Sequence, residues 1–148
     1  MTQKLTNFLN GAKNKEFAIN TGTQMHSLLQ RIVIDDTYQE GNEDIIKIIK
    51  NTPDLMPFFT SNAKTEVPIA GNINGHIVSR RIDRLLINHN SKIIDFIDYK
   101  TDTDKFAFLD KYKLQLKEYA QLLCSAYPDY KINGYILWLH DWKLDKII

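Results

Sequence analysis

The order of the predicted elements indicates an α/β fold of the mixed α+β kind, with helices first, then a three-stranded antiparallel meander, a long helix and a strand. Three observations support this prediction. Apolar residues early in the chain follow helical spacing, tight turns separate strand-like segments between residues 65 and 100, and a long amphipathic segment precedes an apolar run. A chain of 148 residues, 43% of them hydrophobic, is expected to form one domain over residues 1–148.

The chain is predicted to begin with helices. Residues 1–20 are expected to form a helical extension, with a helix over residues 4–13. A second helix is expected to begin at Thr21, because Thr21 and Gln24 have the spacing of a capping box and apolar residues then recur on one side. His26 lies at the edge of that apolar side.

Two shorter helices are expected to follow. Asn42 is predicted to cap the first of them, since two acidic residues come directly after it and negative charge is favourable in a first turn. The other is predicted to start at Thr52 and Pro53 and to end near Phe59, because proline suits the first helical position.

The first two strands are predicted from a hairpin signal. "EVPIAGNI" and "HIVSRRIDRLLI" flank Asn74 and Gly75, which suit a type I′ turn because both of its central positions need positive φ. This turn places Glu66 directly across from Asp83, an unfavourable pair of carboxylates unless a cation lies beside them. A bulge at Pro68 would break that pairing.

A second turn, "NHNS", leads into the strand "IIDFIDYK". If the two ends of this turn pair with each other, Arg81 lies across from Asp98, and Asp83 across from Phe96. Asp83, Asp98 and Lys100 then share one face of the sheet. A register shifted by one residue would instead put the two aspartates on opposite faces.

The last third of the chain is predicted to hold a long helix over residues 105–126, ended by Pro128. "KINGYILWL" then indicates a strand buried on both faces, with a short tail strand after it. Cys124, the single cysteine, excludes an internal disulfide and a cysteine-held cluster, and its apolar neighbours predict that it packs in the core.

Together the predicted strand ends bring Glu66, Asp83, Asp98 and Lys100 to one face. Carboxylate oxygens are the hard ligands that Mg²⁺ or Mn²⁺ prefers, and a lysine beside them can position or help to activate a water. Hydrolysis of phosphodiesters needs this combination of groups. Arg80 and Arg84 are expected on the opposite face, in water or in surface ion pairs.

The segments "GTQMHSLLQ", "EVPIAG", "GHIVSRRIDRLL", "IIDFIDYKT" and "YKLQLKEYAQLL" occur in this order. From Thr21 to His140 the chain thereby resembles the C-terminal nuclease domain of the RecB and AddA helicase–nucleases, within the PD-(D/E)XK nuclease superfamily. The resemblance implies a restriction-endonuclease-like core and an exonuclease module that hydrolyses DNA with Mg²⁺ or Mn²⁺, in processes such as DNA repair and recombination.

The resemblance also assigns roles to residues. It implies a metal held by His26, Asp83 and Asp98, assisted by the backbone carbonyl of Tyr99, with Lys100 as a catalytic residue beside the two aspartates.

Four further residues match the family pattern outside this set. Gln115 and Tyr119 match its Gln-x-x-x-Tyr motif and would support the site or contact DNA. Glu66 matches a glutamate before the first strand's proline, and Arg81 an arginine two residues before the motif aspartate.

The sequence also bears on three possible partners, namely ATP, a helicase and a membrane. No G-x-x-x-x-G-K-[ST] segment is present, so we expect no ATP binding by this chain, and a helicase partner in trans is one hypothesis. The absence of a long apolar run and the polar start predict a cytoplasmic protein without a membrane span.

Two alternatives stay open. One is a catalytically inactive nuclease-fold module that binds DNA or a helicase, in which the charged residues form ordinary salt bridges. The other keeps the chemistry but acts as a structure-specific endonuclease or on RNA. A formal net charge of +1 gives no general affinity for polyanions, so any such site must be local.

Overall fold

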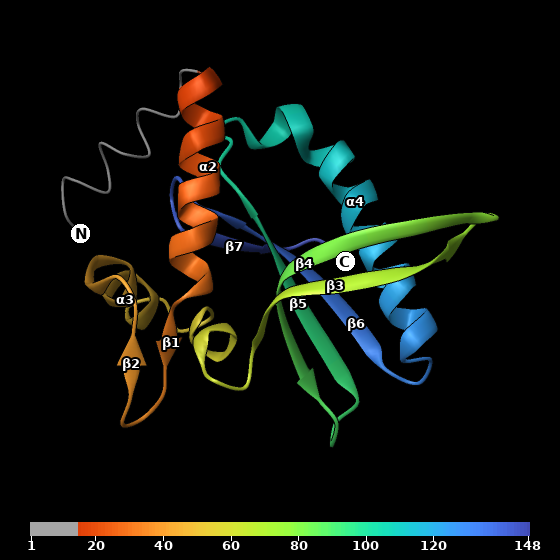
Figure 1. The fold of residues 1–148 in the computed structure, drawn as a ribbon, viewed down its shortest axis with the longest axis horizontal. Coiled ribbons are helices and arrows are strands. Elements are labelled where there is room, and N and C mark those ends of the chain that lie inside the picture. Colours follow the sequence, from red (N-terminus) through yellow and green to blue (C-terminus); the bar gives the residue numbers. More distant parts are fainter. Residues whose placement is uncertain (1–14) are drawn as a thin grey trace.

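The computed structural model describes residues 15–148, with side chains from residue 22 onward, and arranges them around one central sheet (Figure 1). The strands of this sheet are β3 (Lys64–Ile73), β4 (His76–Asn88), β5 (Ile93–Lys100), β6 (Lys131–Trp138) and β7 (Lys143–Lys146). The helices are α2 (Lys15–Gln30), α3 (Glu43–Lys50), the 3₁₀ helix η2 (Met56–Phe59) and α4 (Lys105–Ala126). Two short strands, β1 (Val33–Ile34) and β2 (Gln39–Glu40), pair with each other.

The central sheet is mixed, as the sequence predicts. Its strand order is β3-β4-β5-β6-β7, and neighbours are antiparallel except for β5 and β6, which run parallel. Parallel neighbours need a long crossover, which the 22-residue helix α4 supplies. The predicted meander, long helix and following strand are therefore confirmed, and β7 is the predicted tail strand.

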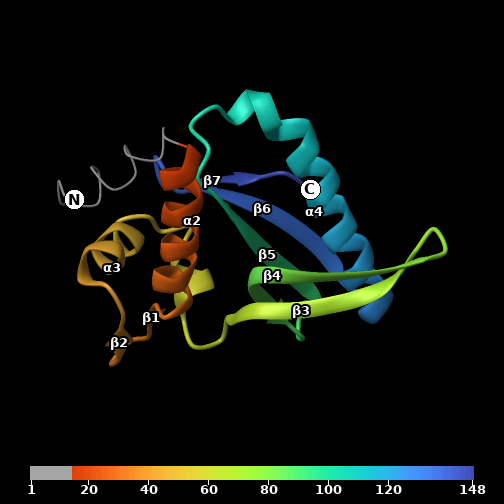
Figure 2. The same cartoon turned by 45° about the horizontal axis from the view of Figure 1, so that its top comes forward.

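Helices cover both faces of the sheet (Figure 2), and apolar side chains join them to it. On one face, Leu116, Tyr119 and Leu123 of α4 pack on Phe96 and Ile136. On the other face the strands meet α2, α3 and η2 through Met25, Leu29, Ile45, Ile49, Phe58, Phe59, Ile97 and Tyr99. The sheet thus lies between two helical layers, each with its own apolar cluster.

Strands β3 and β4 continue past the rest of the sheet as a two-stranded arm (Figures 1 and 2). Asn74 and Gly75 at its tip have φ of 52° and 84°, as a type I′ turn requires. Ile73 pairs with His76 and Pro68 with Arg81, so the predicted register is confirmed and no bulge shifts it at Pro68.

One expected pair of this hairpin is missing. Thr65 pairs with Arg84 and Val67 with Ile82, but Glu66 and Asp83 between them are not a ladder pair. Glu66 has a left-handed backbone with φ of 50°, which is uncommon for a residue with a side chain. The prediction that Glu66 faces Asp83 across the ladder is therefore wrong.

The predicted register of the second turn is also wrong, by two residues. Asn88 pairs with Ile93 rather than Ser91, and Phe96 pairs with Leu85 rather than Asp83. The Asn88 side chain accepts the N–H groups of the second and third residues after it, and Lys92 has φ of 55°, so the loop holds four residues.

A shift of two residues preserves the face of every side chain, since side chains alternate along a strand. It changes the partner of Asp98, which is not Arg81. The ladder ends at Arg84 and Ile97, so Asp83 and Asp98 are the next residues beyond it on their strands, and their carboxyl groups interact.

The helix boundaries were predicted with mixed success. Helix α2 begins at Lys15, so Thr21 lies within it and the prediction of a capping box there is wrong. The predicted helix over residues 4–13 lies outside the described residues. Asn42 does cap α3, its side chain accepting N–H groups at 3.0 and 3.1 Å. The short helix near Phe59 is a 3₁₀ helix.

Helix α4 has the predicted bounds, and Asp104 caps it by accepting the N–H of Ala107. Cys124 is exposed on this helix, so the prediction that it packs in the core is wrong. Its neighbours Leu122 and Leu123 take the buried positions of the last turns. Within residues 15–148, no helix combines the length and the apolar character needed to cross a bilayer.

Arg84 of β4 is buried, contrary to the prediction of a surface position. Its guanidinium donates to the backbone carbonyls of Leu29 and Ile32 at the end of α2, and to that of Phe58 in η2. It also donates to the Tyr99 hydroxyl at 2.9 Å. Helix α2 has no basic residue in its own last turn, so Arg84 supplies the positive charge that a helix C-terminus favours.

We expect Arg84→Met to lower the free energy of unfolding by roughly 3–5 kcal/mol, because it leaves several buried carbonyl oxygens without a donor. Arg80→Met is the matched control: Arg80 is on the same strand, its side chain is 45% exposed, and it pairs with Glu118. Such a surface pair contributes about 0–1 kcal/mol. Urea unfolding measures both, and equal losses would contradict the role of Arg84.

Candidate active site

The candidate site lies where β4 leaves β5 and continues into the arm. The ladder between these strands ends at Arg84 and Ile97. One step further, the carboxylate of Asp83 accepts the backbone N–H of Tyr99 at 2.8 Å, where β4 no longer supplies a ladder partner. Asp83 is therefore oriented by the backbone of the neighbouring strand.

Asp83 and Asp98 form a buried pair of carboxyl groups, only 8% and 5% exposed. Burial does most to raise the pKa of Asp98, Lys100 lowers it, and the charge and hydrogen bond of Asp83 raise it again, to about 6. Two carboxylates so close together are unfavourable unless cations neutralise them. The structure places one cationic side chain against each.

His26 of α2 is the partner of Asp83, with 3.4 Å between its Nε2 atom and the carboxylate. Its Nδ1 atom lies 2.8 Å from the carbonyl of Gly22, one turn earlier, and its ring packs edge-on against Tyr99. Burial lowers the pKa of His26, but the hydrogen bond and charge of Asp83, with smaller effects of Gly22 and Asp98, raise it to about 9. The imidazole is thus protonated at neutral pH in the metal-free protein.

Lys100 is the partner of Asp98, with its ammonium 2.7 Å from the carboxylate. The same ammonium donates to the side-chain carbonyl of Gln115 at 2.9 Å and lies 4.2 Å from the centre of the Tyr112 ring. Gln115 in turn donates to the Tyr119 hydroxyl at 2.9 Å. Helix α4 therefore meets the site through residues spaced three or four apart, on one helical face.

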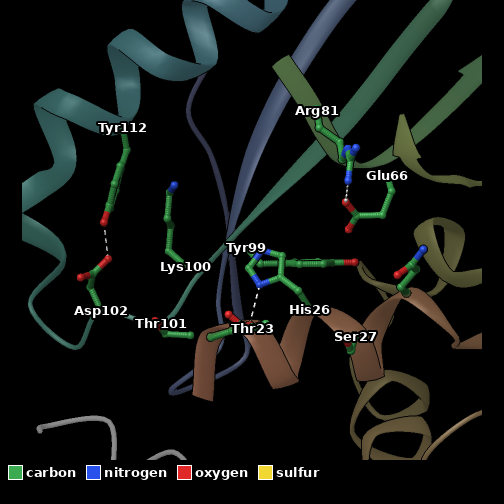
Figure 3. Close-up of a pocket in the computed structure, with 12 residues that line it drawn as sticks. Thr23, His26, Ser27, Glu66, Arg81, Tyr99, Lys100, Thr101, Asp102 and Tyr112 are labelled. Carbon is green, nitrogen blue, oxygen red and sulfur yellow. Dashed lines mark hydrogen bonds and ion pairs between the residues drawn. The ribbon is translucent and has the colours of Figure 1, made fainter. Parts of the chain in front are cut away.

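Glu66 and Arg81 lie at another part of the rim, where their charged groups are 4.0 Å apart (Figure 3). The Arg81 side chain is 69% exposed, whereas that of Glu66 is 23% exposed. Both line the same pocket as His26 and Lys100. No hydrogen bond or ion pair of the described residues joins Glu66 or Arg81 to the two aspartates.

A pocket of about 760 Å³ lies beside the site, lined by both His26 and Lys100. Its walls come from α2, the arm, the end of β5 and the start of α4 (Figure 3). The lining residues are Gly22, Thr23, His26, Ser27, Gln30, Glu66, Arg81, Tyr99, Lys100, Thr101, Asp102 and Tyr112. Asp83 and Asp98 are buried and do not line the pocket, but His26 and Lys100, which do, are in contact with them.

The donors at this site suit a divalent cation. The Oδ2 atom of Asp98 is buried and accepts no hydrogen bond, although the Lys100 ammonium is near it without the alignment of one. Carboxylate oxygens with an imidazole are ligands that Mg²⁺ or Mn²⁺ accepts. Among the described side chains, no three His, Cys, Asp or Glu residues already form a group that could hold a metal. Each aspartate is engaged by a cationic side chain as the site stands.

Two residues that shape this region, Tyr112 and Arg84, were given no role at the site from the sequence. Tyr112 lines the pocket and touches Lys100, and its hydroxyl donates to Asp102. Arg84 fixes the end of α2. Of these, only Tyr112 could have been found from the sequence. It precedes Gln115 by three residues, so both lie on the same side of the predicted helix.

No protein-family model matches this chain, and no curated protein is similar to it at a significant level.

We expect the metal-free protein to lose stability as the pH rises from about 6.5 to 9. The folded state raises the pKa of His26 to about 9, so its contribution is complete below the unfolded value of 6.5 and is lost as His26 deprotonates. Because 34% of the side chain is exposed and water screens the pair, we expect roughly 1–2 kcal/mol. Urea unfolding in EDTA measures this loss.

His26→Gln is the control for that measurement, because glutamine keeps a polar side chain but does not titrate. The variant should show a flatter dependence of stability on pH than the wild type over the same interval. Parallel curves for the two proteins would contradict the assignment of this pH dependence to His26.

Proposed function

We propose that the chain is a divalent-metal-dependent DNA nuclease with a restriction-endonuclease-like core, an exonuclease module of the RecB and AddA type. One observation carries the proposal: the buried carboxyl groups of Asp83 and Asp98 interact with each other, and His26 contacts the first while Lys100 contacts the second. These residues come from α2, β4 and β5, and α4 adds Gln115, in the order of the sequence motifs. Independent surface salt bridges give no reason for such convergence at two buried carboxylates.

In this proposal the metal is Mg²⁺ or Mn²⁺, held by His26, Asp83 and Asp98 with the carbonyl of Tyr99. When bound, the cation would polarise a scissile phosphodiester and neutralise the charge that develops on it. His26 has to release its proton to act as a ligand, which makes the site weaker at lower pH.

Lys100 is the proposed catalytic residue beside the two aspartates, where it would position the attacking water or the phosphate. Its ammonium has three donors, of which one goes to Gln115, while the Asp98 carboxylate lies 2.7 Å away as an ion pair. A donor not used by Gln115 can hold the attacking water or a phosphate oxygen at the pocket, which Lys100 lines. Gln115 and Tyr119 support this lysine from α4.

Contact with DNA is proposed to be local, because the formal net charge is only +1. Arg81 is exposed on the rim and has one long contact of 4.0 Å, to Glu66. A guanidinium can donate two parallel hydrogen bonds to one phosphate group. Arg81 therefore supplies a phosphate contact next to the catalytic residues in this proposal.

The test is cleavage of end-labelled single- and double-stranded DNA with Mg²⁺, Mn²⁺ or EDTA. We expect cleavage only with metal, and a loss of about 100-fold or more in Asp98→Asn and in Lys100→Met, because each removes a group from the reacting centre. Lys143→Met is the control for Lys100→Met, since the Lys143 side chain is 63% exposed on β7.

Cleavage that is equal in Lys100→Met and the wild type would contradict the proposed chemistry. DNA binding without cleavage under every metal condition would instead favour the non-catalytic binding module. Circular substrates in the same assay separate endonuclease from exonuclease action, and RNA tests the other alternative.

Metal uptake can be measured without any nuclease assay. We expect saturating Mn²⁺ to stabilise the wild type by up to about 3 kcal/mol at 100 times its dissociation constant. Thermal unfolding with and without Mn²⁺ should show this shift in Asp110→Asn, where the acidic residue is exposed on α4, and not in Asp98→Asn. An equal shift in both variants would place metal binding elsewhere.

A further inference from the structure

The Lys100 ammonium is surrounded by groups that together determine its position. A carboxylate oxygen of Asp98 lies at 2.7 Å and the carbonyl oxygen of Gln115 at 2.9 Å. The third neighbour is the face of the Tyr112 ring, whose centre is 4.2 Å away. An aromatic face attracts an ammonium through its quadrupole, and more strongly when water is excluded. Lysine has a long flexible stem, so its location depends on such neighbours.

Tyr112 is itself held in place at both ends. It projects from α4 toward the loop after β5, where its hydroxyl donates to the carboxylate of Asp102 (Figure 3). Its ring also lies 6.1 Å from the rings of Phe108 and Trp138. A ring fixed in this way presents a constant face to Lys100 while it lines the pocket.

We propose that Tyr112, anchored by Asp102, is a positioning residue that holds the Lys100 ammonium at Asp98. Its importance for catalysis rests on the proposed nuclease function, but its effect on Lys100 does not. Tyr112 acts through Lys100, and the part of Tyr112 that acts is the ring. The hydroxyl has a second role, which is to fix the ring through Asp102.

This division of roles predicts a graded series of variants. Tyr112→Leu removes the ring and should lower kcat about 10- to 100-fold, as displacement of a catalytic group does, with KM for DNA little changed. Tyr112→Phe keeps the ring and should retain most of kcat. Tyr130→Leu is the matched control, since that tyrosine pairs with His89 and Tyr127 and has no contact with the site among the described interactions.

The anchoring by Asp102 is tested by a double-mutant cycle. Asp102→Ala and Tyr112→Phe each break the same hydrogen bond, so we expect similar small losses in kcat and no further loss when they are combined. Additive losses would show that Asp102 acts independently of Tyr112.

A second measurement does not depend on activity. In protein with ¹³C-labelled lysine, the ε-CH₂ signal of Lys100, assigned by its absence in Lys100→Met, should be shifted upfield by the Tyr112 ring. The shift should persist in Tyr112→Phe and in Tyr130→Leu and disappear in Tyr112→Leu. A Lys100 signal at the position of exposed lysines in the wild type, or one unchanged in Tyr112→Leu, would overturn the proposal.

The two measurements separate the two proposals. If the wild type cleaves no DNA but the upfield shift behaves as expected, the nuclease function fails and the positioning of Lys100 by Tyr112 stands. If the wild type cleaves DNA and Tyr112→Leu has the same kcat, the positioning role is wrong and the nuclease function stands.

Discussion

The buried guanidinium of Arg84 is the constraint on which the rest of the site depends. It joins the carbonyl end of α2 to the 3₁₀ helix η2 and to the Tyr99 hydroxyl of β5. Two helices and two strands therefore meet at one side chain. Asp83 precedes Arg84 on β4, and His26 lies about one turn before Leu29 on α2. The contact between His26 and Asp83 therefore follows from where Arg84 fastens the helix, and the chemistry of the site rests on an interaction outside it.

Charge balance explains why two carboxylates can be buried together. Asp83 and Asp98 lie just beyond the end of the β4–β5 ladder, and each has a cationic neighbour, which is His26 for Asp83 and Lys100 for Asp98. The pKa of His26 is raised by Asp83, so the protonated imidazole contributes stability while it balances the charge of this carboxylate. Lys100 is held differently, since its ammonium also contacts Gln115 and the ring of Tyr112, neither of which is a proposed metal ligand.

Sequence reasoning succeeded where the signal is local and periodic. The turn at Asn74 and Gly75 needs positive φ at both positions, which few other residues tolerate, so the first hairpin and its register could be predicted. The second turn has no such requirement in its middle, and its length depends on Asn88 bonding back to the loop and on Lys92 adopting positive φ. The resulting error of two residues left Asp83 and Asp98 on one face, because the pleat repeats every two residues.

The features that could not be predicted are those in which a residue's partner comes from a distant segment. A charged residue on a strand looks the same in sequence whether it faces water, as Arg80 does, or the end of a helix, as Arg84 does. The left-handed backbone of Glu66 on β3 likewise lies where β4 separates from β5 and the arm begins. The position of that separation depends on the pairing of all three strands, which no local sequence pattern specifies. At the same point, the carboxylate of Asp83 accepts the backbone N–H of Tyr99, which has no partner on β4. The irregularity in the sheet and the candidate active site thus have one physical origin, which is the departure of a strand from its neighbour.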